Sequence, residues 1–136
     1  MSAQNPPQMS EEEEAIQESQ GKLFNLYKHR NINVGTTQAL EKEKKITQLT
    51  LVEIKDIPAD NTCYKSIGRM FIQKSKSELQ DELHKNVSYL GDKLKELGDS
   101  RQNLNKKIVD EEATFREVAA KLQEKHRASQ QTAQVK

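Results

Sequence analysis

Cysteine, tryptophan and aromatic residues in general are scarce in this chain of 136 residues. It has one cysteine, Cys63, and no tryptophan. Hydrophobic residues make up 33% of the chain and aromatic residues only 4%. A single thiol excludes an internal disulfide and cannot form a thiolate metal site alone, which favours a reducing compartment. With 32% charged residues, the composition is poor material for a globular core and favours long helices or partial disorder.

Long apolar runs and an excess of either charge are also missing. No segment approaches the ~20 apolar residues of a membrane span, and residues 1–14 are polar and end in four glutamates, unlike a signal peptide. The 22 basic and 21 acidic residues are interspersed and leave a net charge of +1, so we expect no nucleic-acid or membrane partner. These features predict a soluble cytoplasmic protein that recognises partners by shape and apolar patches.

Motifs of catalysis and cofactor binding are absent from the sequence. It contains no phosphate-binding glycine loop, metal-ligand motif or nucleophile elbow. His29, His84 and His126 have no metal-ligand spacing, and solvated helix positions account for them. We therefore expect no enzyme activity, no metal and no cofactor.

The first half of the chain predicts a tail over residues 1–9 and a helix over residues 10–48. Ser10 supplies a hydroxyl cap, and Glu11 to Glu14 lie near the positive end of the helix dipole. Polar residues interrupt the apolar stripe that follows, which indicates a weak helix. The stripe comprises Ile16, Leu23, Leu26, Tyr27, Val34 and Leu40, and the interruptions are Ser19, Arg30, Asn33 and Thr37.

Residues 49–61 are expected to link this helix to the next element. Thr50 and Glu53 have the spacing of a capping box, which suggests that the first helix ends near Gln48 and a short helix or turn follows. Pro58 disfavours helical geometry at Ile57, so regular structure should stop there.

Residues 62–74 are the one stretch that does not indicate helix, and they predict a β-hairpin. Two short runs rich in β-favouring residues, 64–67 and 70–73, flank Gly68-Arg69. Gly68 can adopt the positive φ of a tight reversal. Met70 and Ile72 should share one face of the ribbon and Phe71 the other. Because an isolated two-stranded hairpin is marginally stable, we expect other chains to complete it.

Residues 75–126 predict a second, stronger helix, followed by a polar tail over 127–136. Ser75 or Ser77 can cap it. Spacing by four and three gives one narrow seam, typical of a coiled coil, in which only Arg101 and Glu111 are polar. The seam is Leu83, Val87, Leu90, Leu94, Leu97, Arg101, Leu104, Ile108, Glu111, Phe115, Val118 and Leu122.

Two long helices joined by a short segment must pack antiparallel. At 1.5 Å per residue they would be ~60 Å and ~75 Å long, and the first would run out opposite roughly residue 116. Val118 and Leu122 should then lack a partner within the chain, which suggests a contact surface for other proteins. The alternative, ordinary coil packing at these two residues, stays open. The predicted fold is mostly α, a long antiparallel two-helix coiled coil with one β-hairpin at its base.

The run Tyr64-Lys65-Ser66-Ile67-Gly68, set between two coiled-coil helices, resembles the β-class subunits of prefoldin, whose hairpin carries a similar Tyr-Lys-x-Val-Gly core. Its continuation through Ile72 is most similar to a eukaryotic subunit of that class. The resemblance covers roughly residues 10 to 125. It implies a hexamer of two α-class and four β-class subunits whose hairpins form a double β-barrel. It also implies that the coil tips hold unfolded proteins, notably actin and tubulin, and deliver them to the cytosolic chaperonin without ATP.

Two sets of candidate site residues follow from these observations. The expected assembly hairpin comprises Tyr64, Ile67, Gly68, Met70, Phe71 and Ile72, and the expected client-binding tip comprises Ile16, Phe115, Val118 and Leu122. A structural tether or scaffold dimer without chaperone activity is the alternative function. It explains the helices but gives the apolar hairpin no role.

Overall fold

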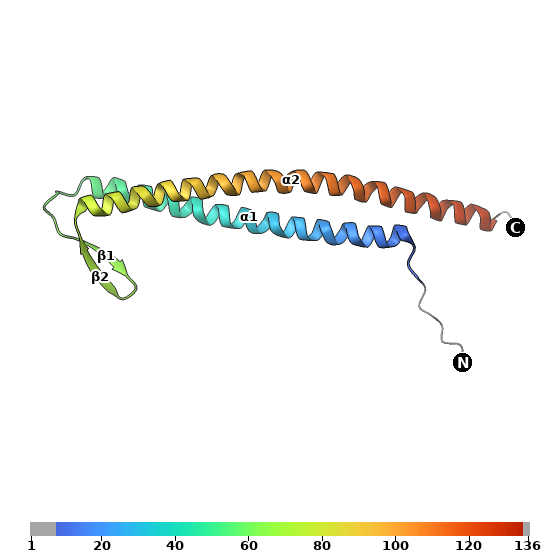
Figure 1. The fold of residues 1–136 in the computed structure, drawn as a ribbon, viewed down its shortest axis with the longest axis horizontal. Helices are drawn as coiled ribbons and strands as arrows, with labels where there is room; N and C mark the ends of the chain where they lie inside the picture. The colour runs from blue at the N-terminus through green and yellow to red at the C-terminus, as the bar shows by residue number, and fades with distance from the viewer. Residues whose placement is uncertain (1–7, 135–136) are drawn as a thin grey trace, which may run out of the picture. The chain divides into compact units, whose positions relative to one another are not determined.

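The computed structural model describes residues 8–134, and its elements follow the predicted order (Figure 1). The elements are α1 (Glu11–Lys55), β1 (Cys63–Ile67), β2 (Met70–Lys74) and α2 (Lys76–Gln134). The expected fold of two long helices and one antiparallel hairpin is confirmed. Most of the tail expected over residues 1–9 lies outside the described residues.

The chain divides into two compact units, each containing part of both long helices. The hairpin unit comprises residues 33–100, with the end of α1, the hairpin and the start of α2. The terminal unit comprises residues 8–32 and 101–134 of the described chain, with the start of α1 and the end of α2. Within each unit the two helices pair antiparallel: Asn33 bonds Leu97 in the hairpin unit, and Glu12 bonds Lys125 in the terminal unit.

Both helices begin at the serine caps that the sequence indicates. Ser10 Oγ accepts from the Glu13 backbone N–H at 3.3 Å, and the Glu13 carboxylate accepts from the Ser10 backbone N–H at 3.3 Å. This reciprocal pair is a capping box. At the start of α2, the Glu78 backbone N–H donates to Ser75 Oγ at 3.1 Å. Of the two possible caps, Ser75 is therefore the one used.

The first helix ends at Lys55, whereas the sequence suggested an end near Gln48. Thr50 does not cap a new helix, because its hydroxyl donates to the Ile46 carbonyl one turn back at 2.8 Å and leaves α1 unbroken. Lys76 Nζ donates to the carbonyls of Lys55 and Ile57 at 3.0 and 2.7 Å. The first residue of α2 thus satisfies free carbonyl groups at the end of α1.

The second helix continues to Gln134, beyond the end expected near residue 126. Residues 127–134 are polar but contain neither glycine nor proline, so nothing in them stops a helix that is already formed. Thr132 follows the helix by donating its hydroxyl to the Ala128 carbonyl at 2.7 Å. The polar tail of the prediction is thus helical through Gln134.

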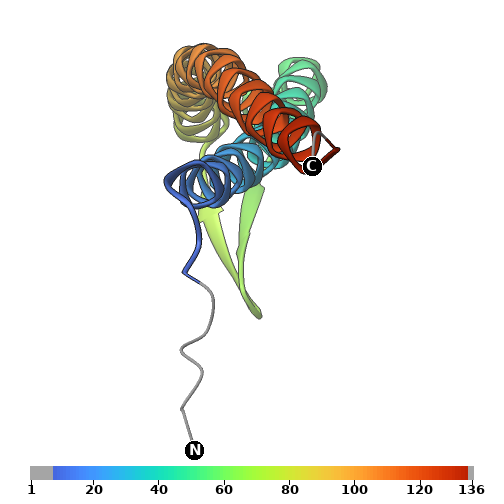
Figure 2. The same cartoon turned by 90° about the vertical axis from the view of Figure 1, so that its right-hand side faces the viewer.

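The hairpin has the register expected from a two-residue turn. Ile67 pairs with Met70, Ser66 with Phe71 and Lys65 with Ile72. Gly68 has φ of 58°, which a glycine at the first central position of a tight hairpin turn adopts without steric cost. Both views show the hairpin projecting from the helix ends to which it is joined (Figures 1 and 2).

The seam of α2 agrees with its sequence pattern. All twelve predicted seam residues are at least half-buried, and Leu90 and Ile108 are the most buried apolar side chains among the described residues. Neither Gly91 nor Gly98 brings a partner backbone close, since a Cβ at Gly91 would meet only Lys44 Nζ and one at Gly98 would meet nothing within 4 Å. These glycines are tolerated in the helix rather than required for packing.

The seam of α1 differs from the expected stripe. Ser19, Asn33 and Thr37, which interrupt the apolar pattern, are buried, as is Thr47. They lie on a strict heptad seam that also includes Ile16, Leu23, Leu26, Arg30, Leu40, Lys44, Leu51 and Ile54. The physical reason is that α2 presents one apolar seam, and whatever α1 places opposite it is buried. Half of the α1 seam is therefore polar.

Candidate assembly and client-binding surfaces

The hairpin presents its large apolar side chains to solvent. Tyr64, Ile67, Met70, Phe71 and Ile72 are all exposed, and Phe71 is 73% exposed. The strands bring these five predicted side chains together within ten paired residues, around the turn at Gly68. An exposed apolar group of this size on a short ribbon is typical of a protein interaction surface.

The strand register divides these side chains between two faces. Paired residues share a face, so Ile67, Met70 and Ile72 lie on one side, and Phe71 lies on the other with Tyr64. The expected separation of Met70 and Ile72 from Phe71 is confirmed. Because the described sheet has two strands, each strand also has one edge without a neighbouring strand. Near the turn, both faces and both edges are open to other chains.

Glu82 of α2 holds the root of the hairpin. Its carboxylate accepts from Lys65 Nζ of β1 at 3.0 Å and also from Lys74 Nζ of β2. These hydrogen bonds, first from Lys74 and then from Lys65, lower the pKa of the Glu82 carboxyl below its usual value. One acidic side chain therefore ties both strands to the helix. Sequence reasoning missed Glu82, because nothing local marks which glutamate of a charged helix meets the hairpin.

Replacing Glu82 with glutamine is expected to loosen the hairpin. A pair of exposed ion pairs contributes little in water, so backbone amide exchange at Lys65 and Lys74 should rise about twofold to fivefold. Because the folded-state pKa of Glu82 is lowered, the tether is complete above the ordinary pKa of 4.5 and is lost as pH falls through the lowered value. The carbon-13 shift of the Glu82 carboxyl measures that titration directly.

Glu96→Gln is the control for this experiment. Glu96 lies on the same helix and in the same unit, and pairs at 3.5 Å only with Lys93 one turn away. Its replacement should leave exchange in the hairpin unchanged. Equal exchange in both variants would show that Glu82 does not hold the ribbon.

The predicted client-binding residues lie at the free end of the terminal unit, but they are not unpaired. Ile16, Phe115, Val118 and Leu122 are all half-buried. Lys125 Nζ of α2 donates to the Glu12 carboxylate of α1 at 3.1 Å. The expectation that Val118 and Leu122 lack a partner within the chain is therefore wrong, since α1 reaches residue 125 rather than 116. Their role in client binding stays a prediction.

Polar side chains join the two helices within the terminal unit. Ser19 Oγ donates to Glu111 at 2.8 Å, so the polar seam residue Glu111 pairs with a hydroxyl of α1. Tyr27 donates its hydroxyl to Glu112, which raises the pKa of Tyr27 above its ordinary value. The Arg30 guanidinium lies 5.2 Å from the centre of the Tyr27 ring. Directional bonds thus replace part of the apolar packing that a two-helix seam usually has.

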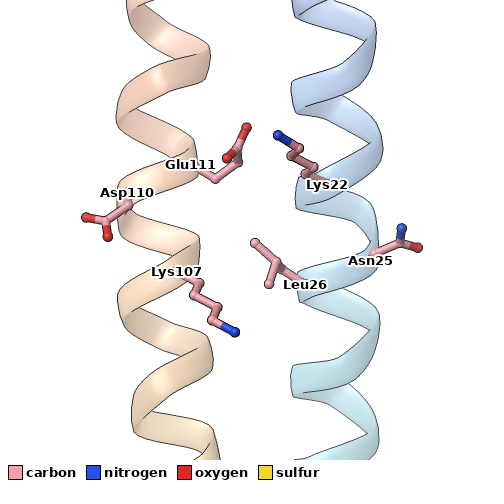
Figure 3. A pocket seen from close by; sticks show the side chains of 6 residues that line it. All are labelled: Lys22, Asn25, Leu26, Lys107, Asp110 and Glu111. Carbon is pink, nitrogen blue, oxygen red and sulfur yellow. The ribbon is translucent and has the colours of Figure 1, made fainter.

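A shallow hollow opens beside this part of the seam. Figure 3 shows Leu26 pointing across toward α2, with Lys22 and Lys107 on either side of it. Asn25 and Asp110 point away from the gap. The hollow thus combines the apolar side chain of Leu26 with the charged groups of Lys22, Lys107 and Glu111.

Three exposed apolar residues on the helices of the terminal unit were missed from the sequence. Phe24, Ile32 and Val109 are 68%, 57% and 63% exposed. All three fall between seam positions, and that departure from the heptad pattern is the signal that marks them. They add apolar surface to a unit whose predicted contact residues are half-buried.

No helix in the described part of the chain is both long enough and apolar enough to cross a membrane. Within residues 8–134, the histidine, cysteine, aspartate and glutamate side chains form no group of three or more that could hold a metal ion.

Comparison with known proteins identifies the family. A family model described as prefoldin subunit matches residues 17–133, which cover the hairpin and most of both helices. The chain belongs to the prefoldin subunit family. Prefoldin subunit 1 of Danio rerio is 30% identical over 104 residues, which cover 76% of this chain and 85% of the relative. Probable prefoldin subunit 1 of Dictyostelium discoideum is 26% identical over 110 residues, covering 81% and 96%.

A solved structure supports the same conclusion. The prefoldin β subunit from Thermococcus strain KS-1 superimposes with a TM-score of 0.67 at 25% identity, over 85% of this chain and 96% of that one. The resemblance of the hairpin run to β-class prefoldin subunits, and within them to eukaryotic prefoldin subunit 1, is confirmed. This prefoldin subunit belongs to a family of chaperone components rather than of enzymes.

Proposed function

We propose that this prefoldin subunit is one of six subunits of an ATP-independent co-chaperone, with two α-class and other β-class chains as partners. The observation that carries the proposal is the hairpin, whose five large apolar side chains are exposed on both faces. A two-stranded ribbon with this surface is marginally stable alone. Neighbouring hairpins that extend it into a larger sheet would cover the side chains and pair both edges.

The work on clients is assigned to the free end of the terminal unit. The half-buried residues Ile16, Phe115, Val118 and Leu122 become available when the helices separate there, and Phe24 and Val109 are already exposed. Because the α1 seam of this unit includes the polar residues Ser19 and Arg30, separation exposes less apolar surface than opening an all-apolar seam would, and it costs correspondingly less.

The proposed clients are unfolded proteins such as actin and tubulin, which pass to the cytosolic chaperonin. Holding an unfolded chain requires many weak apolar contacts and no cofactor. The proposed working location is then the cytoplasm, where the chaperonin acts and where a free thiol such as that of Cys63 stays reduced.

Replacing Val118 and Leu122 together with aspartate is expected to weaken client holding and to spare assembly. Charged side chains at these positions oppose contact with apolar client segments. Complexes of the variant with its partner subunits should need about twofold to tenfold more material to suppress aggregation of unfolded actin, because other tips still bind. Light scattering during dilution from denaturant measures this effect.

The control is Ala120→Asp, which introduces an aspartate at an exposed position between the two substituted residues and adds one negative charge where the double variant adds two. Its complexes should suppress aggregation as the unmodified ones do. If the double variant also suppresses aggregation normally, the tip of this subunit does not hold clients.

The alternative of a structural tether or scaffold dimer is separated by the native mass of the purified assembly. A hexamer with distinct partner chains supports the chaperone, and a homodimer supports the tether. No feature of the described residues favours the tether, since it leaves the exposed hairpin side chains without a role.

A further inference from the structure

The outer surface of α1 in the hairpin unit carries a second group of exposed apolar side chains. Ile46, Leu49 and Val52 are 54%, 57% and 61% exposed. They are spaced by three residues, so each follows the previous one by nearly one helical turn. Together they form a continuous patch about 9 Å long along the helix. None of the three lies on the α1 seam, so packing against α2 does not explain them.

A groove continues this patch toward α2. Leu51, Val52 and Lys55 line it from α1, and Gln80 and His84 line it from α2. Most of the groove surface is apolar, with the polar ends of Lys55, Gln80 and His84 at its margins. We refer to Ile46, Leu49 and Val52 together with this groove as the outer patch.

The hairpin of the same chain lies on the other flank of the helix pair. Thr50 and Glu82 line a hollow together with Tyr64 and Lys65 of β1, so the hairpin root is on their side. Val52 and His84 each follow these residues by two positions, which is a rotation of about 200° around their helices. Val52 and the groove at His84 therefore face away from the hairpin root, whereas Ile46, four residues before Thr50, lies at the edge of the patch nearest to it. The part that faces away needs another chain to cover it.

The area of the hairpin gives a second reason to expect a larger interface. The exposed fractions of its five apolar side chains correspond to roughly 500 Å². A stable interface covers about 800 Å² on each partner. The three exposed residues of the outer patch supply most of the area by which the hairpin falls short of such an interface. They belong to the same compact unit as the hairpin.

We propose that the outer patch receives the apolar face of a β-hairpin from a neighbouring prefoldin subunit. Side chains on one face of a strand repeat at about 6.6 Å, so two of them fit along the patch. Lys55 and Gln80 supply side-chain donors for the carbonyl groups at an open strand edge. The inference rests on the proposed assembly through hairpins and adds the surface on which a neighbouring hairpin docks.

The test compares Val52→Glu with Val109→Glu. Both residues are valines on helix surfaces with nearly equal exposure, 61% and 63%, but Val109 belongs to the terminal unit. Each variant is co-expressed with the full set of partner subunits, and native mass spectrometry measures the hexamer fraction. Val52→Glu should reduce the affinity of this subunit for the complex at least about tenfold, and Val109→Glu should leave it unchanged. Circular dichroism should show equal helix content in both.

A photo-crosslinker attached at position 52 identifies the occupant. The Val52→Cys variant also carries Cys63→Ser, so that only the new thiol is labelled, and the adduct in the assembled complex is mapped by peptide mass. Attachment to a hairpin peptide of a partner subunit supports the proposal. Attachment to a helix of a partner, or to no partner, overturns it.

The outcomes separate this inference from the proposed function. If Val52→Glu assembles normally while Phe71→Asp does not, the outer patch is not a docking surface and assembly through the hairpin stands. If both assemble normally, assembly through the hairpin fails as well. Equal losses for Val52→Glu and Val109→Glu would show a general effect of added charge and overturn the assignment of the patch.

Discussion

Replacing Phe71 with aspartate is expected to remove this subunit from the chaperone complex. Phe71 is the most exposed large apolar side chain among the described residues, at 73%, and is the second residue of β2, opposite Ser66. In a sheet formed by several hairpins the aspartate would be buried without a partner, at a cost that should lower affinity about 100-fold or more. Gel filtration and native mass spectrometry of co-expressed subunits measure the loss.

Phe24→Asp is the matched control for this variant. Phe24 is also a phenylalanine and is 68% exposed, but it lies on α1 in the terminal unit. Its replacement should leave the hexamer intact, and both variants should keep their helical signal. Normal co-purification of partner subunits with Phe71→Asp would contradict the role assigned to the hairpin.

Replacing Asn33 with leucine and Thr37 with valine is expected to stabilise the chain. These residues are only 6% and 7% exposed, and Asn33 Oδ1 and Thr37 Oγ1 have no hydrogen-bond partner. A buried polar atom without a partner costs about 1–3 kcal/mol. Asn33 also donates Nδ2 to the Leu97 carbonyl at 3.0 Å, and the variant loses that bond. The net gain should be about 3 kcal/mol, with a Tm higher by roughly 10 °C.

Thr36→Val is the control for helix propensity. Thr36 is the neighbour of Thr37 and is exposed, so the same substitution there changes the helix backbone preference without removing a buried hydroxyl. Thermal unfolding followed by circular dichroism should show little change for Thr36→Val and a higher Tm for Thr37→Val alone. Equal Tm values for the two single variants would show that the buried hydroxyl of Thr37 is not destabilising.

The polar seam also suggests why such residues persist where leucine would be more stable. Asn33 reaches the Leu97 carbonyl, and Ser19 reaches Glu111, so each unit has a directional bond between its helices. Apolar side chains alone tolerate sliding by a turn, whereas a buried hydrogen bond is satisfied in one register. The helix pair of this protein is proposed to open. Restoring the correct register when α1 and α2 pair again is then as important as the free energy of that pairing.

Several features follow from local chemistry and were accessible without coordinates. The capping box at Ser10, the serine cap of α2, the turn at Gly68 and the pairing of Ile67 with Met70 each depend on residues within a few positions of one another. The seam of α2 is accessible for a related reason. Its apolar residues repeat with so few interruptions that only one face of the helix can be buried.

Other features depend on which side chains meet across the chain. Thr50 can cap a new helix or bond back within an existing one, and the choice falls to α1 because Leu51 and Ile54 continue its seam. Burial of Asn33 and Thr37 follows from the face that α2 covers, not from their own polarity. The bonds from Lys74 and Lys65 to Glu82 join different elements 8 and 17 residues apart, and the bond from Lys125 to Glu12 joins residues 113 apart.

Local propensity and periodicity therefore determine the elements and the apolar helix face, because each residue carries that information alone or with its near neighbours. The polar seam, the tether at Glu82 and the partners of Val118 and Leu122 require the folded chain. Their energies come from pairs of groups that are brought together only when the helices and the hairpin pack.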